Sequence, residues 1–135
     1  MSQTSSKDLA LLCAQAAIDK KANHSIIFEV GKLGAFTEYF LITGGSNERQ
    51  VQAIANSLDD MAKANGISRP LIEGYDEGRW ILADFGGVVV HIFHDYIREF
   101  YDLETLWAEA PRLNIPTEFF TTQSQPMQAA ASAAR

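Results

Sequence analysis

Two runs of strand-like residues, 80–85 and 88–93, are separated by the pair Gly86–Gly87. Two glycines between such runs are typical of a β-hairpin, because glycine adopts positive φ at the central positions of a tight turn without steric cost. With the turn placed there, Leu82 lies opposite His91 on the neighbouring strand. The pattern therefore predicts a hairpin with a defined register.

Side chains alternate between the two faces of a strand, so this register sorts the hairpin residues into two surfaces. The first surface is wholly apolar and is predicted to be core; it comprises Ile81, Ala83, Phe85, Val88, Val90 and Ile92. The second mixes large hydrophobic side chains with a carboxylate and an imidazole; it comprises Trp80, Leu82, Asp84, Val89, His91 and Phe93. A packed interior has to satisfy such polar groups, so the second surface is the first place to look for function.

Hydrophobic spacing along the rest of the chain predicts further helices and strands. These are a helix over 7–22, strands over 25–30 and 38–43, a helix over 47–66, a short edge strand over 70–74 and a helix over 96–108. Ser6 is expected to cap the first helix and Asn23 to end it. The strand over 38–43 is almost continuously apolar and is therefore expected to be central.

This order of elements predicts an α/β or α+β fold, in which a mixed sheet is flanked by helices. A length of 135 residues suits one domain. We expect a flexible N-terminus over 1–6, a folded domain over 7–110 and an extended or disordered tail over 111–135. The tail is rich in Ser, Gln and Ala and lacks periodicity.

Composition narrows the range of partners. No apolar run is long enough to span a membrane, and with one cysteine, Cys13, and no secretion signal the expected location is the cytoplasm. The net charge of −6 is uneven, because residues 73–109 hold nine carboxylates against Arg79 and Arg98, a local balance of −7. That region repels phosphate backbones and attracts a basic partner, so we expect no direct binding of nucleic acid there.

Signals for catalysis are weak. The turn Gly44-Gly45-Ser46 between a strand and a helix is a possible phosphate cradle and supports the alternative of a nucleotide-binding or nucleotidyltransferase-like enzyme. Such enzymes hold Mg²⁺ with paired acidic residues on a strand, whereas Asp84 stands alone on its strand. His91 and His94 lack further metal-binding neighbours in the sequence. We therefore expect no enzyme activity, no metal and no cofactor.

Two structural pairs are expected from spacing. Asp84 lies diagonally from His91 across the hairpin, within reach of a side-chain hydrogen bond. Arg98 and Asp102 have the spacing of one helical turn, and Glu104 is a further possible ion-pair partner.

Trp80, Leu82 and Phe93, continued by Tyr101 and Trp107, give the second hairpin surface the composition of a protein-binding hot spot. The alternative is that the C-terminal helix of the same chain covers this surface. Some residues of the surface can bind a partner while others are covered, so the two hypotheses are compatible. A third alternative is that the surface forms a homodimer.

Several motifs of the chain closely resemble those of the ribosomal silencing factor family (RsfS, Iojap-like). They are Thr37-x-Tyr39-Phe40, Ser46-Asn47-x-Arg49-Gln50-Val51, Glu73-Gly74, Trp80-x-Leu82-x-Asp84, Gly87-Val88-Val89-Val90-His91-Ile92-Phe93 and Arg98-x-Phe100-Tyr101-x-Leu103-Glu104-x-Leu106-Trp107. The resemblance spans about Leu9 to Trp107. The hairpin and the motif that follows it are its most specific parts.

The resemblance implies a nucleotidyltransferase-like fold without the catalytic metal site. It also implies binding to the large ribosomal subunit through its protein fourteen (uL-fourteen), which blocks joining of the small subunit and represses translation when nutrients are scarce. It further implies a homodimer. The contact residues that it implies are Trp80, Ile81, Asp84, His91, Tyr101, Leu103 and Glu104. Ile81 conflicts with the hairpin register, which places it in the core.

Overall fold

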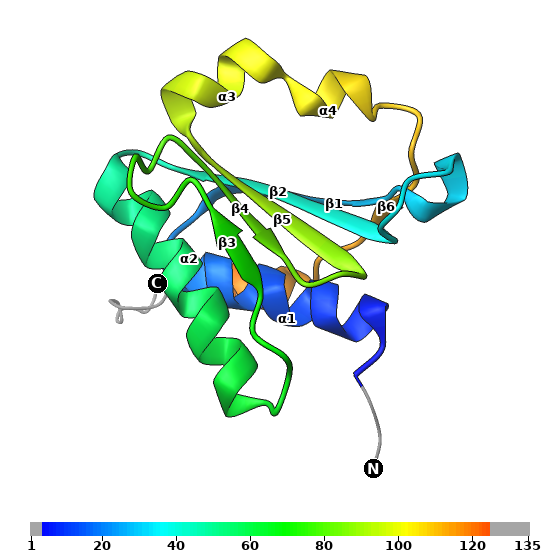
Figure 1. Cartoon of the computed structure of the whole chain (residues 1–135), viewed down its shortest axis with the longest axis horizontal. Coiled ribbons are helices and arrows are strands. Elements are labelled where there is room, and N and C mark those ends of the chain that lie inside the picture. Colours follow the sequence, from blue (N-terminus) through cyan, green and yellow to red (C-terminus); the bar gives the residue numbers. More distant parts are fainter. Residues whose placement is uncertain (1–3, 125–135) are drawn as a thin grey trace.

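The computed structural model describes residues 4–124 as a six-stranded mixed sheet with helices on both faces (Figure 1). The elements are α1 (Ser6–Asp19), β1 (Asn23–Glu29), the 3₁₀ turn η1 (Gly31–Leu33), β2 (Tyr39–Gly45), α2 (Glu48–Ala64), β3 (Leu71–Glu73), β4 (Trp80–Asp84), β5 (Val88–His94), α3 (Asp95–Tyr101), α4 (Leu103–Leu106), β6 (Arg112–Leu113) and α5 (Thr117–Ser124). The prediction of a single α+β domain with a mixed sheet is confirmed.

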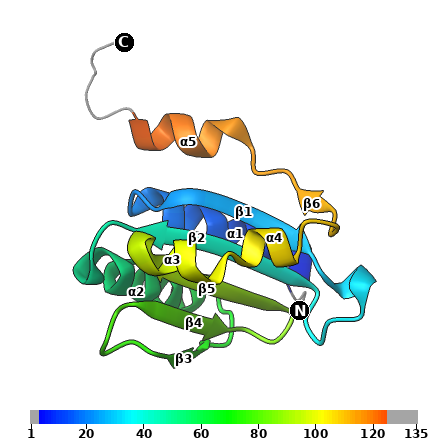
Figure 2. The same cartoon turned by 90° about the horizontal axis from the view of Figure 1, so that it is seen from above.

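The strands follow the order β3-β4-β5-β2-β1-β6, in which β2 and β5 run parallel and every other neighbouring pair is antiparallel. β2 is central, as its continuous apolar run predicts, and β3 is an edge strand. Helices α1 and α2 cover one face of the sheet, and α3 and α4 lie over the other (Figure 1). Seen from above, α3 and α4 lie over β2 and β5, and β4 and β3 lie beyond them toward one edge of the sheet (Figure 2).

The hairpin has the predicted register, with Leu82 opposite His91 and Asp84 opposite Val89. The side chains predicted to be core pack against α1 and α2. The two turn glycines serve different purposes. Gly86 adopts a φ of 93°, whereas a Cβ on Gly87 would collide with the hydroxyl of Ser6.

Helix ends differ from the prediction by one to three residues. Ser5, not Ser6, caps α1, because its hydroxyl accepts the N–H of Asp8 at 3.1 Å. The helix ends at Asp19, and Lys21 takes a left-handed φ of 64°. β1 accordingly begins at Asn23, two residues earlier than predicted.

The C-terminal part departs further from the prediction. The helix predicted over 96–108 is broken into α3 and α4, because Asp102 has a left-handed φ of 41°. Of the segment 111–135, for which we expected an extended or disordered chain, residues 112–113 form edge strand β6 and 117–124 form helix α5. Residues 125–135 lie outside the described part of the chain.

Candidate functional site

The second hairpin surface lies on the side of the sheet that carries α3 and α4, and Trp80 is its centre. The indole stacks on Phe93 and lies against Tyr101, with ring centroids 4.9 and 4.8 Å apart. The indole N–H donates to Nδ1 of His91 at 3.2 Å. Three elements, β4, β5 and α3, therefore fix the position of one large side chain.

His91 is 6% exposed and surrounded by aromatic rings, with Phe40 of β2 edge-on at 4.9 Å. Burial disfavours the charged imidazolium and lowers the pKa of His91 to about 4. Because the indole can only donate, Nδ1 must be the acceptor and the neutral ring carries its proton on Nε2. Nε2 is buried and has no hydrogen-bond partner among residues 4–124.

The predicted hydrogen bond between Asp84 and His91 is wrong. Oδ1 of Asp84 instead accepts the N–H of Gly86 at 2.8 Å and stabilises the hairpin turn. A local bond two residues away in sequence is entropically easier to form than a diagonal one across the sheet. Asp84 thus remains a half-exposed carboxylate at the edge of the surface.

The alternative that the chain's own C-terminal segment covers the second surface holds for some of its residues. Phe93 is covered: it is 1% exposed and packs in a second core cluster with Ile97, Leu103 and Trp107 of the C-terminal segment. Other large side chains remain outside this cover, and Tyr101 is 54% exposed. The result is an apolar face built on a packed aromatic base.

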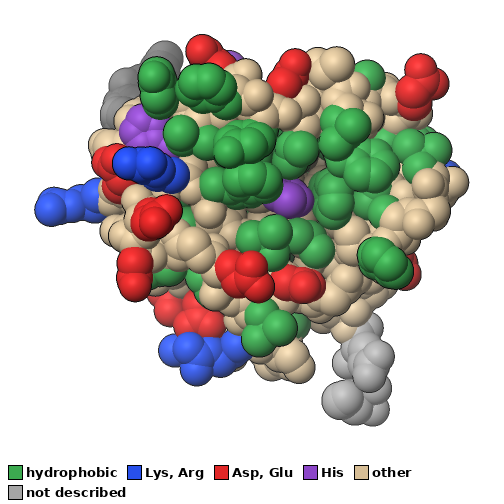
Figure 3. Space-filling model, turned by 45° about the horizontal axis from the view of Figure 1, so that its top comes forward, with side chains coloured by type: hydrophobic (Ala, Val, Ile, Leu, Met, Phe, Trp, Pro, Cys, Tyr) green, Lys and Arg blue, Asp and Glu red, His purple; other side chains and the backbone are tan. Residues whose placement is uncertain are grey.

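We call this surface the docking face and define it by the sheet residues Trp80, Leu82, Asp84, Val89 and His91 and the helix residues Phe100, Tyr101, Leu103, Leu106 and Trp107. Figure 3 shows hydrophobic side chains gathered across it around a histidine, with acidic side chains at its margin. Such a patch on the described surface is typical of a macromolecular contact.

Two of the contact residues implied by resemblance do not present free side chains here. Ile81 is fully buried on the opposite face of β4, as the register predicts. Glu104 forms an ion pair with Arg98, with Oε2 3.1 Å from Nη2. The helix-surface pair of Arg98 with Asp102 is not formed; instead the Asp102 carboxylate accepts the hydroxyl of Thr105 at 2.7 Å.

Sequence reasoning missed two residues that lie beside this face. Phe40 contacts both His91 and Trp107, the latter edge-on at 5.4 Å. Leu71 of β3 pairs with Asp84 and so lies on the same side of the sheet, 72% exposed. The alternation of β2 and β3 carries this information, but only after the strand order is known.

The turn Gly44-Gly45-Ser46 has a packing explanation. The N–H of Ser46 donates to Oε1 of Gln50 at 2.7 Å, so a group that a phosphate would need is already satisfied. A Cβ on Gly44 would lie 2.9 Å from the carbonyl oxygen of Phe93 and 3.0 Å from the carboxylate of Asp95. The glycine thus allows α3 to approach the end of β2 closely.

The described residues also give no support for a metal site or a reactive cysteine. No group of three His, Cys, Asp or Glu side chains within 4–124 is placed to hold a metal ion. Cys13 is fully buried in α1, and burial raises the pKa of its thiol far above the ordinary value, which makes it unreactive. None of the described helices is long and apolar enough to cross a membrane.

The structure is thus a small α+β protein whose sheet carries a partly exposed aromatic face. The model of the family "Ribosomal silencing factor during starvation" matches residues 3–135. The ribosomal silencing factor RsfS of Bacillus subtilis is 43% identical over 105 residues, which is 78% of this chain and 89% of the relative. RsfS of Halalkalibacterium halodurans is 40% identical over 111 residues, 82% of this chain and 95% of the relative.

A crystal structure of a Chromobacterium violaceum protein superposes with a TM-score of 0.74 at 33% identity, covering 77% of this chain and 87% of the other. The chain belongs to the ribosomal silencing factor (RsfS, Iojap-like) family. This is a family of translation regulators and not of enzymes, so the nucleotidyltransferase-like activity considered from the sequence is set aside.

Proposed function

We propose that this protein binds the large ribosomal subunit through its protein fourteen (uL-fourteen), using the docking face. Bound there, it occupies the surface on which the small subunit would dock, blocks subunit joining by steric exclusion and represses translation, above all when nutrients are limiting. Family membership supports a role at the ribosome. The choice of partner, the steric mechanism and the contact residues are the proposal.

The observation that carries the proposal is an aromatic face left partly uncovered by α3 and α4 and rimmed by acids. The proposed contact residues are Trp80, Asp84, His91, Tyr101 and Leu103; the Trp80 indole donates to His91 and lies against Tyr101. Residues 73–109 carry a balance of −7, which suits a basic ribosomal protein better than ribosomal RNA. Ile81, buried on the other side of the sheet, and Glu104, paired with Arg98, are proposed to support the face and not to touch the partner.

Three further properties complete the proposal. The protein acts in the cytoplasm, forms a homodimer, and uses a nucleotidyltransferase-like fold without its metal-binding acids. The lone carboxylate Asp84 on β4, engaged with Gly86, supports the last point.

Sedimentation through a sucrose gradient tests the proposal. The protein is mixed with purified bacterial large subunits, and small subunits are then added. We expect the wild type to travel with large subunits and to reduce the amount of whole ribosomes. Trp80→Ala should weaken this association by about 2 kcal/mol, roughly thirtyfold, because Trp80 is the central aromatic anchor.

Two further variants separate binding from folding. Tyr101→Ala removes a more exposed ring of the same face and should also weaken association. Phe120→Ala removes an exposed ring on α5, which packs against α1 on the other side of the sheet, and should bind like the wild type. A folded Trp80→Ala protein that binds normally would contradict the proposed face, and a wild type that stays at the top of the gradient would contradict the function.

A further inference from the structure

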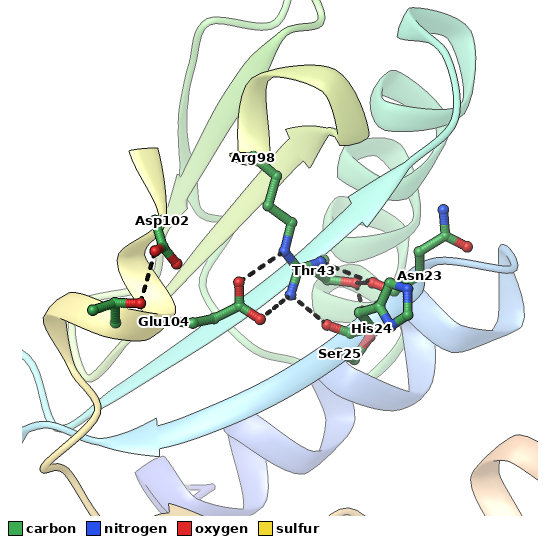
Figure 4. A network of polar contacts seen from close by, with 8 residues as sticks. Asn23, His24, Ser25, Thr43, Arg98, Asp102 and Glu104 are labelled. Atoms are coloured by element: carbon green, nitrogen blue, oxygen red, sulfur yellow. Dashed lines mark hydrogen bonds and ion pairs between the residues drawn. The ribbon is translucent and has the colours of Figure 1, made fainter. Parts of the chain in front are cut away.

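Arg98 of α3 is a buried charge whose guanidinium spans two parts of the fold (Figure 4). Its side chain is almost entirely enclosed, with 9% of the residue exposed. Nη1 donates to the carbonyl oxygen of Asn23 at 3.2 Å, and Nη2 donates to that of His24 at 2.7 Å. Nε and Nη2 donate to the two carboxylate oxygens of Glu104 at 3.4 and 3.1 Å.

The acceptors from β1 are available because the strand is irregular at its start. Its register with β2 shifts between Asn23 and Ile26, and His24 takes a left-handed φ of 49°. This bulge turns two backbone carbonyls toward α3. The amide of Asn23 also donates to Asp95 at 2.8 Å, so the first turn of α3 is tied to the same place.

Arg98 lies beside a hollow with a mostly polar lining. An open hollow of about 740 Å³ lies between the start of β1 and the segment α3–α4, lined by His24 and Ser25 on one side and by Glu99 and Asp102 on the other. Apart from Ile26, every residue that lines the hollow is polar or charged. At this end of the segment the multiply bonded guanidinium therefore makes the connection, and bonds to ionised groups are the stronger class of hydrogen bond.

The bridged segment is the one that completes the docking face. Tyr101 at the end of α3 lies against Trp80, and Trp107 just after α4 lies edge-on to Phe40. Glu104 sits in α4, a helix of four residues that follows the left-handed Asp102. Fixing Glu104 to Arg98 consequently fixes the direction in which α4 leaves α3.

We propose that Arg98 and Glu104 are a positioning pair: the guanidinium holds the bulge of β1 and the carboxylate of α4 together, and Glu104 supports partner binding through Arg98 rather than by touching the partner. The role in binding rests on the proposed function. The positioning of α4 does not depend on it. Both oxygens of the Glu104 carboxylate face Arg98. The two charges therefore already have hydrogen-bond partners within the chain, without a bound partner protein.

A double-mutant cycle on binding to purified large subunits tests the pair. Glu104→Gln should lower the association constant about tenfold in the wild-type background, and it should change it less than about twofold in an Arg98→Met background. It should also leave the salt dependence of binding unchanged, because no ion contact between the two molecules is removed. Equal losses in both backgrounds, with a reduced salt dependence, would show a direct contact and overturn the proposal.

Hydrogen exchange in the free protein tests the positioning separately. The N–H of Trp107 donates to the carbonyl of Leu103 at 3.0 Å, and its exchange should accelerate at least about tenfold in Arg98→Met and in Glu104→Gln. Amides of α2 should exchange as in the wild type. Unchanged exchange in α4 would overturn the positioning whether or not the wild type binds ribosomes, whereas a wild type that fails to bind would count against the proposed function alone.

Two variants guard against unfolding and against general charge effects. Arg98→Lys keeps the charge but not the forked geometry, so it should give a smaller loss of both binding and α4 protection than Arg98→Met. Arg69→Met is the matched control, since Arg69 pairs at 2.7 Å with Asp59 of α2, the helix on the opposite face of the sheet, and its side chain is 63% exposed. It should leave binding and α4 exchange unchanged.

Discussion

At the scale of residues, the pair of Trp80 and His91 shows how a polar group is tolerated inside an aromatic face. The imidazole accepts the hydrogen bond of the indole N–H, and the indole stacks on Phe93. That geometry requires a neutral imidazole, and burial supplies it by lowering the pKa of His91 from 6.5 to about 4. One proton therefore links the stability of the fold to the shape of the docking face.

This linkage predicts a pH dependence of stability. Below pH 6.5 the unfolded chain binds a proton at His91, while the folded chain does so only below about pH 4. The unfolded state is thus favoured as the pH falls, and the free energy of unfolding should drop by about 2 kcal/mol between pH 7 and pH 5 from this group. Urea denaturation at both pH values measures it.

His91→Gln is the control for that experiment, because glutamine keeps an acceptor for the indole and does not titrate. It should lose stability at both pH values, yet the difference between pH 7 and pH 5 should shrink by about 2 kcal/mol relative to the wild type. A variant with the same pH difference as the wild type would show that other groups are responsible.

Gly44 carries a second prediction at this scale. A Cβ there would lie 2.9 Å from the carbonyl of Phe93, which is backbone and cannot easily move, so Gly44→Ala should destabilise the protein by about 1–3 kcal/mol. Gly34→Ala is a useful comparison, since its Cβ would meet nothing within 4 Å and only its φ of 88° is unfavourable. Thermal unfolding should therefore show the larger loss for Gly44→Ala. A larger loss for Gly34→Ala would contradict the packing explanation given for Gly44.

At the scale of elements, the segment 95–107 is where sequence reasoning succeeded least. Its hydrophobic spacing predicts one helix, yet Asp102 adopts αL and divides it into α3 and α4. The reason is tertiary: the break lets Glu104 reach Arg98 and brings Leu103 onto the sheet. Helix propensity is a property of the local sequence. It therefore cannot predict a contact with the bulge in β1, which supplies two of the acceptors of Arg98.

The break itself is testable. Alanine is strained at the positive φ of Asp102, so Asp102→Ala should cost about 1–2 kcal/mol and favour the continuous helix that the sequence pattern suggests. It also removes the acceptor of the Thr105 hydroxyl. Asp102→Asn is the matched control, because asparagine tolerates αL and retains an oxygen acceptor. Circular dichroism and thermal unfolding should place Asp102→Asn close to the wild type, and equal losses in the two variants would contradict the role of αL strain.

At the scale of the whole molecule, patterns with a local cause were predictable and contacts across the sheet were not. The Gly86–Gly87 turn fixes a register, so the two hairpin faces and the burial of Ile81 follow from the sequence. The central position of β2 follows from its apolar run. The hydrogen bonds of Arg98 to β1 join residues that are 74 and 75 positions apart in the sequence. The hydrophobic pattern of the chain does not predict such contacts. The excess of acidic residues in 73–109 can be counted from the sequence. Only the fold shows that acidic side chains lie around an aromatic face.

That charge distribution bears on self-association. The homodimer is a proposal, and the docking face is one of the surfaces considered for it. Two copies meeting through this face would bring together two regions that each carry a balance of −7, and like charges at a contact are unfavourable. We therefore expect the docking face to stay free in any homodimer. In sedimentation velocity at low salt, Trp80→Ala and Tyr101→Ala should show the same oligomeric state as the wild type at equal concentration. If either substitution converts a dimer into a monomer, the face is a self-interface, and binding to the large subunit would then require the dimer to open.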